Sequence, residues 1–264
     1  MADLSAIREW EQAEIARSRV EAGQASAARL ATDEAGIQRY ARPPADTPFP
    51  LEYAYHLLGD VTRLTVLDYG CGDGENTVLL ARRNARIVAL DVSEALLDLA
   101  RSRLARDAKI RLPLFLAGSA HEIPLPASSV DVVFGIAILH HLDLDRSAAE
   151  IRRVLKPGGR AIFQEPVRDS RTLKIIRGLI PYRAADVSDF ERQLTSIDID
   201  RFSRGFRRGR DRAFSLPFIN LAQVMPWSRR HLDRLYKLDG AILARAPILR
   251  RYAGIRVFEL IKSA

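Results

Sequence analysis

The stretch VLDYGCGDGENTVLLA, Val66 to Ala81, decides the fold class of this 264-residue chain. It begins with an apolar run, passes through Gly70, Gly72 and Gly74, and continues with apolar residues at helical spacing. Glycines permit the left-handed backbone of a sharp turn and let a ligand approach the main chain closely. The stretch therefore predicts a buried strand, a glycine loop and a helix whose first free N–H groups face a ligand.

The same alternation continues on the C-terminal side of this stretch. Further strands are predicted at residues 85–91, 110–118 and 129–139, and a fifth ends at Glu165. Helical patterns separate them, one with Ser93 as its N-cap and one that stops at a Pro-Gly-Gly turn. Strands that alternate with helices at this spacing form βαβ units. We therefore expect an α/β fold, with a mostly parallel sheet covered by helices on both faces.

The two ends of the chain differ from this central part. Residues 1–50 have a helical pattern followed by the proline-rich RPPADTPFP, and we interpret them as an N-terminal helical flap before a domain at 51–264. After Glu165 the alternation is looser, and we place cap elements within about residues 167–250. The patterns there predict helices at 170–182, at 190–204 with Thr195 as cap and at 228–247, and strands at 207–218 and 254–262.

Composition limits the classes of protein that the chain can represent. Its 47% hydrophobic residues are enough for one globular core, and the single Cys71 excludes an internal disulfide framework and a multi-cysteine zinc site. A reducing cytosol suits such a chain. The charged N-terminus does not resemble a signal peptide, and no run approaches the ~20 apolar residues of a membrane span. We expect a cytoplasmic protein.

The net charge of +8 is unevenly distributed along the chain. Residues 201–264 contain fifteen Lys or Arg and four Asp or Glu, whereas the preceding part is nearly balanced. Such a basic region suits nucleic acid, anionic lipid or an acidic substrate, and it is equally the pattern of a solvated arginine-rich surface.

The spacing of the glycines and the acids around them indicate the kind of ligand. Dinucleotide-binding loops read G-x-G-x-x-G, but position 75 is Glu, which gives G-x-G-x-G. Asp68 and Glu75 would repel a diphosphate and would suit a cation. Asp91 ends the second predicted strand, where a carboxylate can accept both hydroxyls of a ribose. Together these features favour an adenosine ligand with a positively charged tail.

Four segments in this order resemble successive motifs of the class I S-adenosylmethionine-dependent methyltransferases. They are VLDYGCGDGENT, IVALDVSEALLDLA, AGSAHEIPLPASSVDVVFGIAILHHLD and EIRRVLKPGGRAIFQEP. The resemblance is to the type 11 branch, which includes ubiquinone- and menaquinone-biosynthesis and small-molecule enzymes, and it covers about Leu51 to Pro166. It implies a Rossmann-like fold with a seven-stranded sheet, with S-adenosyl-L-methionine as cofactor and S-adenosyl-L-homocysteine as product.

The resemblance also implies a set of cofactor-binding residues. Asp68, Gly70 and Gly72 would line the methionine end, and Asp91 would hold the ribose. The adenine would pack on Val92 and meet Ser119 and Ala120, although the family usually has Asp where this chain has Ser119. The full expected set is Tyr40, Asp68, Gly70, Cys71, Gly72, Gly74, Asp91, Val92, Ser119, Ala120 and Ile136.

Methyl transfer from a sulfonium is an in-line displacement that needs alignment, exclusion of water and, for a protonated acceptor, a base. His140 and His141 follow the fourth predicted strand and Glu165 ends the fifth, so adjacent strand ends would bring them together. We expect His141 and Glu165 to act on the acceptor, where the carboxylate can take a proton itself or orient an imidazole. A structural role is the alternative for both residues, and for His140 it is the favoured one. No histidine has companions at metal-ligand spacing, so we expect no metal.

Apolar segments near the C-terminus, FSLPFINLAQVMPW and AILARAPILRRYAG, suit either a small core or a cap over a hydrophobic acceptor. The favoured function is methylation of a small acceptor, with oxygen ahead of carbon or nitrogen in a quinone, lipid or natural-product precursor. A binder of S-adenosylmethionine without transfer, a nicotinamide-dependent oxidoreductase and a nucleic-acid methylase are the alternatives, and nucleic acid is the least favoured partner. Peripheral contact with anionic membrane and a homodimer are left open.

Overall fold

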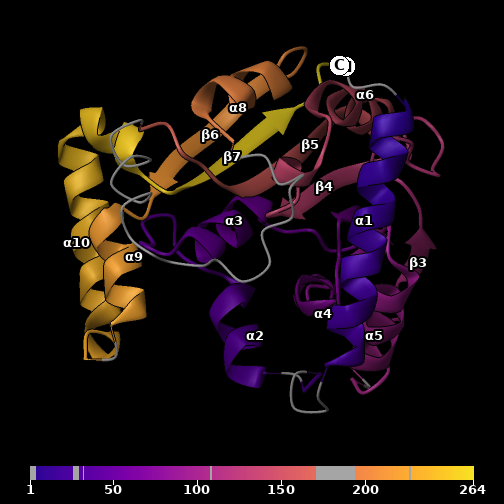
Figure 1. Ribbon diagram of the computed structural model, residues 1–264, viewed down its shortest axis with the longest axis horizontal. Coiled ribbons are helices and arrows are strands. Elements are labelled where there is room, and N and C mark those ends of the chain that lie inside the picture. Colours follow the sequence, from indigo (N-terminus) through magenta and orange to yellow (C-terminus); the bar gives the residue numbers. More distant parts are fainter. Residues whose placement is uncertain (1–3, 26–29, 32, 108, 171–193, 226) are drawn as a thin grey trace.

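A computed structural model describes residues 4–25, 30–31, 33–107, 109–170, 194–225 and 227–264 (Figure 1). Its centre is a seven-stranded sheet in the order β3-β2-β1-β4-β5-β7-β6. Only pairs that include β7 are antiparallel, which confirms the expected mostly parallel sheet. The strands are β1 Thr65–Tyr69, β2 Arg86–Asp91, β3 Leu114–Ala117, β4 Val130–Ile136, β5 Leu155–Pro166, β6 Arg207–Phe214 and β7 Ile255–Ile261.

Helices cover both faces of this sheet. On one face, α6 (Leu144–Val154) and α8 (Ser196–Phe202) contribute buried apolar residues to a core with Tyr69 and Phe163. On the other face, α3 (Pro50–Leu58), α4 (Glu75–Ala81) and α5 (Glu94–Leu104) pack against alternate residues of the same strands. Because successive strand residues point to opposite faces, one sheet supplies both cores. The doubly covered sheet confirms the predicted fold class.

Local signals placed several element ends correctly. Ser93 caps α5 by accepting the N–H of Leu96, and Thr195 forms a capping box with Asp198 at the start of α8.

Two strand ends differ from the prediction. The Pro-Gly-Gly turn was expected between helix and strand, but β5 begins before it, at Leu155, and pairs there with Val130. The strand predicted to reach residue 218 ends at Phe214, because a proline begins the next helix.

The N-terminal part contains α1 (Leu4–Gly23) and α2 (Glu34–Ala41), and α1 packs against α5. At the other end, α9 (Pro217–Val224) and α10 (Leu232–Arg245) lie side by side as a hairpin beyond β6 (Figure 1). Short 3-10 helices are η1 (Leu139–His141), η2 (Arg229–His231) and η3 (Pro247–Tyr252). The helix predicted at 170–182 lies, apart from its first residue, outside the described residues, so a cap after β5 stays a prediction.

Within the described parts of the chain, no helix is both long enough and apolar enough to cross a bilayer.

Candidate functional site at the carboxyl ends of the strands

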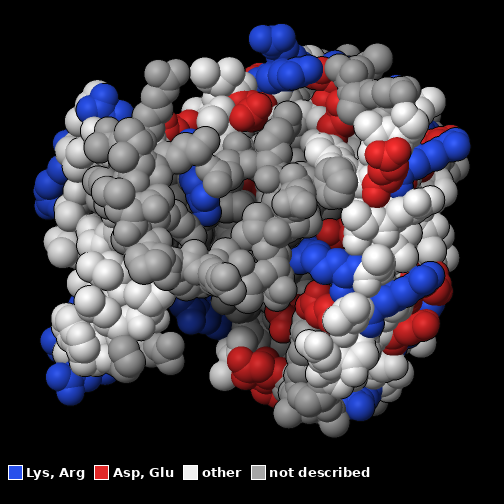
Figure 2. Space-filling model, viewed as in Figure 1, with Lys and Arg blue, Asp and Glu red and all other residues white. Residues whose placement is uncertain are grey.

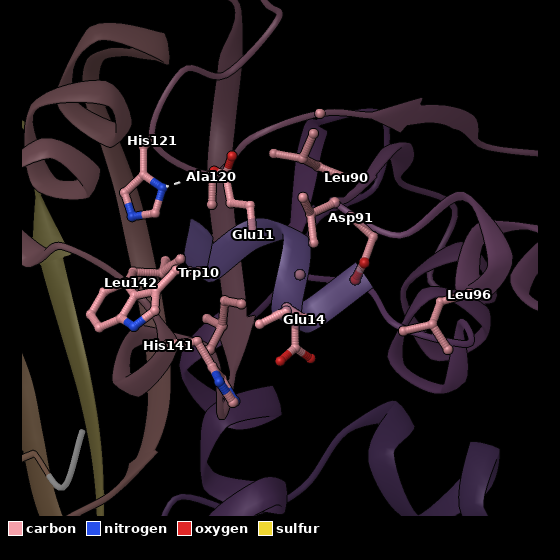
Figure 3. Close-up of a pocket in the computed structure, with 15 residues that line it drawn as sticks. Trp10, Glu11, Glu14, Leu90, Asp91, Leu96, Ala120, His121, His141 and Leu142 are labelled. Carbon is pink, nitrogen blue, oxygen red and sulfur yellow. Dashed lines mark hydrogen bonds and ion pairs between the residues drawn. The ribbon is translucent and has the colours of Figure 1, made fainter. Parts of the chain in front are cut away.

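A cavity of about 90 Å³ lies beyond the carboxyl ends of β1, β2 and β4, under helix α1 (Figure 3). The strand order reverses between β1 and β4, and ligands of open α/β sheets bind at such switch points. Five of the predicted site residues line the cavity: Gly70, Asp91, Val92, Ala120 and His141. Other lining residues were not foreseen: Trp10, Glu11, Ala13, Glu14, Leu90, Leu96, Gly118, His121, Ile138 and Leu142.

The glycine loop is fixed by two different constraints. Gly70, Gly72 and Gly74 all have positive φ, of 73°, 53° and 85°. A Cβ at Gly70 would lie 2.6 Å from Cδ1 of Ile138, and one at Gly74 would lie 2.9 Å from Cβ of Ala100 on α5. A Cβ at Gly72 would meet nothing within 4 Å. The positive φ therefore favours glycine at all three positions, and close packing additionally excludes a side chain at the first and the last.

Asp91 joins the loop to the end of β2. Its Oδ2 accepts the N–H of Gly72 at 2.9 Å, and its Oδ1 accepts the N–H of Ser93 at 2.9 Å. Burial raises the pKa of this carboxyl, and the two backbone donors oppose the shift. A carboxylate has about four lone-pair positions, so each oxygen can accept one more donor from the cavity.

Asp68 and Cys71 lie behind the loop and do not line the cavity. Both are buried, and Asp68 Oδ2 accepts the hydroxyl of Thr77 at 2.6 Å. Burial raises the pKa of Asp68 to about 7, against the effect of the Thr77 hydrogen bond. Burial also raises the pKa of the Cys71 thiol well above its usual range, so Cys71 is a packed residue of the loop.

Helix α1 forms the wall opposite the strand ends, and its Glu11 carboxylate contacts the residues that follow β3. Glu11 accepts a hydrogen bond from the hydroxyl of Ser119, and its Oε1 lies 3.1 Å from Nδ1 of His121. Nε2 of His121 accepts the backbone N–H of Asp143 at 2.9 Å, so the ring proton is on Nδ1 and is donated to Glu11. Burial would raise the pKa of Glu11, but the hydrogen bonds from His121 and Ser119 hold it below its usual value.

A second acid of α1 also faces the cavity. Figure 3 shows Glu14 between Asp91 and His141. Its charge adds to the rise in the pKa of Asp91 and opposes the lowering of the pKa of His141. Its own Oε1 pairs with Arg17 at 2.5 Å. The cavity is thus bordered by three carboxylates, two of them from α1.

The two histidines after β4 have different surroundings. His140 Nδ1 lies 3.0 Å from Glu165 Oε2, and Glu165 Oε1 accepts the N–H groups of Ile138 and Leu139, both at 2.8 Å. Glu165 is fully buried, so its oxygens hold η1 in place. His141 lines the cavity, and its ring contacts that of His140 in a tilted arrangement, with 4.1 Å between the ring centroids. Burial, with the nearby His140, lowers the pKa of His141 to about 4.

Two further predicted residues do not line the cavity. Tyr40 on α2 is half-buried against Tyr55, with 5.3 Å between ring centroids, and Ile136 at the end of β4 packs in the core. Ile138, two residues later, lines the cavity instead. Their expected contacts with a cofactor stay predictions. Among the described residues, no group of three or more His, Cys, Asp or Glu side chains is arranged to hold a metal ion.

Residues 67–163 match the family described as a methyltransferase domain. This part of the chain is a class I methyltransferase domain. It contains the glycine loop, Asp91, Ser119 and both histidines after β4, whereas α1 lies outside it.

Two proteins with similar sequences are methyltransferases by name. The chain is 38% identical over 112 residues to the demethylmenaquinone methyltransferase of Lactococcus lactis subsp. lactis (strain IL1403), which covers 41% of this chain and 44% of that protein. It is 34% identical over 99 residues to the malonyl-acyl-carrier-protein O-methyltransferase of Serratia marcescens, covering 37% of this chain and 36% of that protein. The chain thus spans less than half the length of either relative.

The similarity to a solved structure extends over more of the chain than the similarity to these two sequences. The geranyl diphosphate C-methyltransferase of Streptomyces coelicolor A3(2), in complex with Mg²⁺, geranyl diphosphate and S-adenosyl-L-homocysteine, superposes with a TM-score of 0.56 at 16% identity. The match covers 79% of this chain and 78% of that one. At this identity the similarity shows the shared fold alone.

Proposed function

We propose that this chain binds S-adenosyl-L-methionine in the cavity beyond β1, β2 and β4 and transfers its methyl group to a small, hydrophobic acceptor. The observation that supports this most strongly is Asp91, which is held by Gly72 and Ser93 with one free acceptor position on each oxygen. The match of residues 67–163 to methyltransferase domains supports the same assignment.

The residues around the cavity fit this cofactor chemically. Asp91 can accept the two hydroxyls of a ribose, and Leu90, Val92 and Ala120 offer an apolar surface for a flat ring. Glu11 and Glu14 add negative charge, which favours a cationic ligand. When bound, the cofactor supplies the electrophilic methyl group. Helix α1 borders this cavity, so we propose that α1 moves outward when the cofactor enters.

His141 is the residue that we assign to the acceptor. With a pKa of about 4, lowered mainly by burial, its ring is neutral at pH 7 and has a nitrogen lone pair. A neutral ring does not repel a cation and can take a proton from an acceptor hydroxyl as the new bond forms. A role for a base fits a protonated oxygen better than a carbon acceptor, and this supports our preference for O-methylation.

Glu165 and His140 are positioning residues in this proposal. Glu165 is fully buried and its oxygens are engaged by Ile138, Leu139 and His140, so it is not free to contact an acceptor. Instead it fixes the turn that presents His141. Of the two roles that the sequence leaves open for Glu165, acting on the acceptor and orienting an imidazole, we propose the second.

The acceptor is proposed to be apolar for two reasons. The cavity wall contains Trp10, Ile138 and Leu142, which offer no charge to a substrate. In addition, demethylmenaquinone is named in one of the proteins with similar sequences. C- or N-methylation of such a compound, and binding of the cofactor without transfer, are the alternatives that an activity screen separates.

The test is incubation of the purified chain with S-adenosyl-L-methionine and a library of phenols, quinols and lipid alcohols, with mass spectrometry for the gain of one methyl group. We expect a methylated hydroxyl compound, and we expect His141→Asn to lower turnover tenfold or more, on the order of a general-base effect, with cofactor affinity nearly unchanged. Methylation at carbon only, or a turnover by His141→Asn equal to that of the unchanged chain, would contradict the role of His141 as a general base. Cofactor binding without any product would favour the binding protein.

A further inference from the structure

The α9–α10 hairpin, residues 217–252 with its connecting turn and η3, exposes an unusual amount of apolar surface. Of the ten large hydrophobic side chains that are exposed among the described residues, five belong to this hairpin. Their exposed fractions are 54% for Leu221, 62% for Val224, 66% for Trp227, 51% for Leu238 and 69% for Ile248. Single exposed apolar residues are ordinary, but such a concentration in one segment indicates an interaction surface.

The inner side of the hairpin is firmly attached, so this exposure is not the result of a loosely packed segment. Asp239 is buried and accepts the N–H groups of Ser215 and Leu216 at 2.9 and 2.8 Å. The ring of Tyr236 lies 5.0 Å from that of Phe49, and its hydroxyl accepts a hydrogen bond from Gln223 at 2.8 Å. The hairpin therefore presents its outer side as a defined surface.

The charge of the hairpin is strongly one-sided. Residues 217–252 contain seven Lys or Arg and two Asp or Glu. One of the two acids, Asp239, is buried, and the other, Asp233, acts on Arg39 of α2. None of the exposed basic side chains of the hairpin pairs with a carboxylate of another described residue. Those side chains are Arg230, Arg234, Lys237, Arg245, Arg250 and Arg251.

Basic and apolar side chains are exposed together on the hairpin. On α10, Arg234, Lys237 and Leu238 are exposed and lie on the side of the helix away from Asp239 and Leu243. Figure 2 shows blue side chains at the lower end and along the outer edge of the hairpin lobe, around a white surface. Trp227 lies in the turn between the two helices, with the exposed Arg230 three residues later.

We propose that the outer side of the α9–α10 hairpin docks on an anionic lipid surface. An interfacial segment of this kind buries aliphatic and tryptophan side chains at the boundary between headgroups and acyl chains, while Lys and Arg contact the headgroups. Val224 and Trp227 supply the apolar contact, and Arg230, Arg234 and Lys237 supply the charge. A second copy fits less well, because two such surfaces would bring like charges together. This inference does not depend on the proposed methyl transfer.

The experiment is co-sedimentation of the full chain with vesicles of phosphatidylcholine alone or with phosphatidylglycerol. We expect binding to the anionic vesicles only, and a decrease as salt is added. Each basic residue near an anionic surface contributes about 1 kcal/mol, so Arg234→Gln with Lys237→Gln should lower the partition coefficient by about 30-fold. Trp227→Ser should lower it by about tenfold through lost apolar burial.

Arg111→Gln with Leu112→Ser is the matched control, because both side chains are exposed in a loop outside the hairpin. This control should bind as the unchanged chain does. Circular dichroism of every variant checks that the fold is retained. Equal binding to neutral and anionic vesicles, or equal binding by the control and the hairpin variants, would overturn the proposal. Dimers that Trp227→Ser dissociates, or capture by an acidic protein without vesicle binding, would assign the surface to those partners and would also overturn it.

Discussion

The two walls of the cavity are built in different ways. The wall from β1, β2 and β4 is held by backbone groups, such as the N–H of Gly72 on Asp91 and those of Ile138 and Leu139 on Glu165. The wall from α1 packs against α5 and is joined to the strand ends by side chains, as in the contacts of Glu11 with Ser119 and His121. A wall fixed by backbone is rigid, whereas a helix attached by side chains can move at a lower cost in free energy. The first wall suits recognition and the second suits entry.

The largest loss of stability in the wall from the strand ends is expected for a substitution at Glu165. Glu165→Gln leaves the size of the side chain but removes the charge that accepts from Ile138, Leu139 and His140. We expect the free energy of unfolding to fall by about 3 kcal/mol, as when one partner of a buried charged network is lost. Urea unfolding measures it. Glu94→Gln on the exposed surface of α5 is the control, and an equal loss in both variants would show that Glu165 does not hold this wall.

The glycine loop gives a second test of the rigid wall. Gly70→Ala adds strain at φ 73° and a contact 2.6 Å from Ile138, whereas Gly72→Ala adds strain at φ 53° and meets nothing within 4 Å. We expect Gly70→Ala to cost about 2 kcal/mol more than Gly72→Ala in thermal or urea unfolding, because overpacking adds to strain. An equal loss of free energy of unfolding in the two variants would mean that Ile138 moves aside for the added methyl group.

The pH dependence of stability sharpens the same comparison at Asp68. Burial raises its pKa in the folded chain to about 7, above the value near 4 of an unfolded chain. Between these values the folded state holds a proton that the unfolded state has released, so this contribution to stability falls as pH rises from about 4 to 7. The slope should approach about 1.4 kcal/mol per pH unit and be absent from Asp68→Asn. If stability depended on pH in the same way in the unchanged chain and in Asp68→Asn, the raised pKa of Asp68 would be contradicted.

The smallest effect is expected in the α1 wall. Glu11→Gln weakens the contacts with Ser119 and His121, at a cost of about 1 kcal/mol. Hydrogen exchange of α1 amides should become about fivefold faster, while β1 and β2 remain protected. Glu9→Gln, exposed on the same helix, is the matched control. Faster exchange in β1 and β2 as well would show that the two walls are one unit.

These differences also explain what the sequence could predict. The wall from the strand ends was predictable because its residues follow directly from the strands. The glycines, Asp91 and the residues after β4 each lie at or just after the end of a strand, and the parallel sheet brings these ends together. The alternation of apolar runs fixed the parallel strands for the same reason, although β5 begins at Leu155 and β6 ends at Phe214, where pairing and a proline decided the ends.

The α1 wall could not be predicted in this way. Glu11 and Ser119 are 108 residues apart, and α1 buries only Ile7 and Ser18, so no strong apolar face indicated where it packs. One signal was present: Ser119 stands where the resembling family has an acid, and an acid from another segment can occupy that space. The role of His121 could not be predicted either, because it also depends on contact with Glu11. From the sequence, His121 was considered only as a possible metal ligand.

The central claim is that Asp91 anchors the cofactor in this cavity, and calorimetric titration with S-adenosyl-L-homocysteine tests it most directly. Asp91→Asn should weaken binding by about 30-fold, which corresponds to about 2 kcal/mol of lost charge-assisted hydrogen bonding. Asp98→Asn, which removes an exposed carboxylate paired with Arg101 on α5, should bind as the unchanged chain does. Unchanged affinity in Asp91→Asn, or no binding by the unchanged chain, would contradict the account.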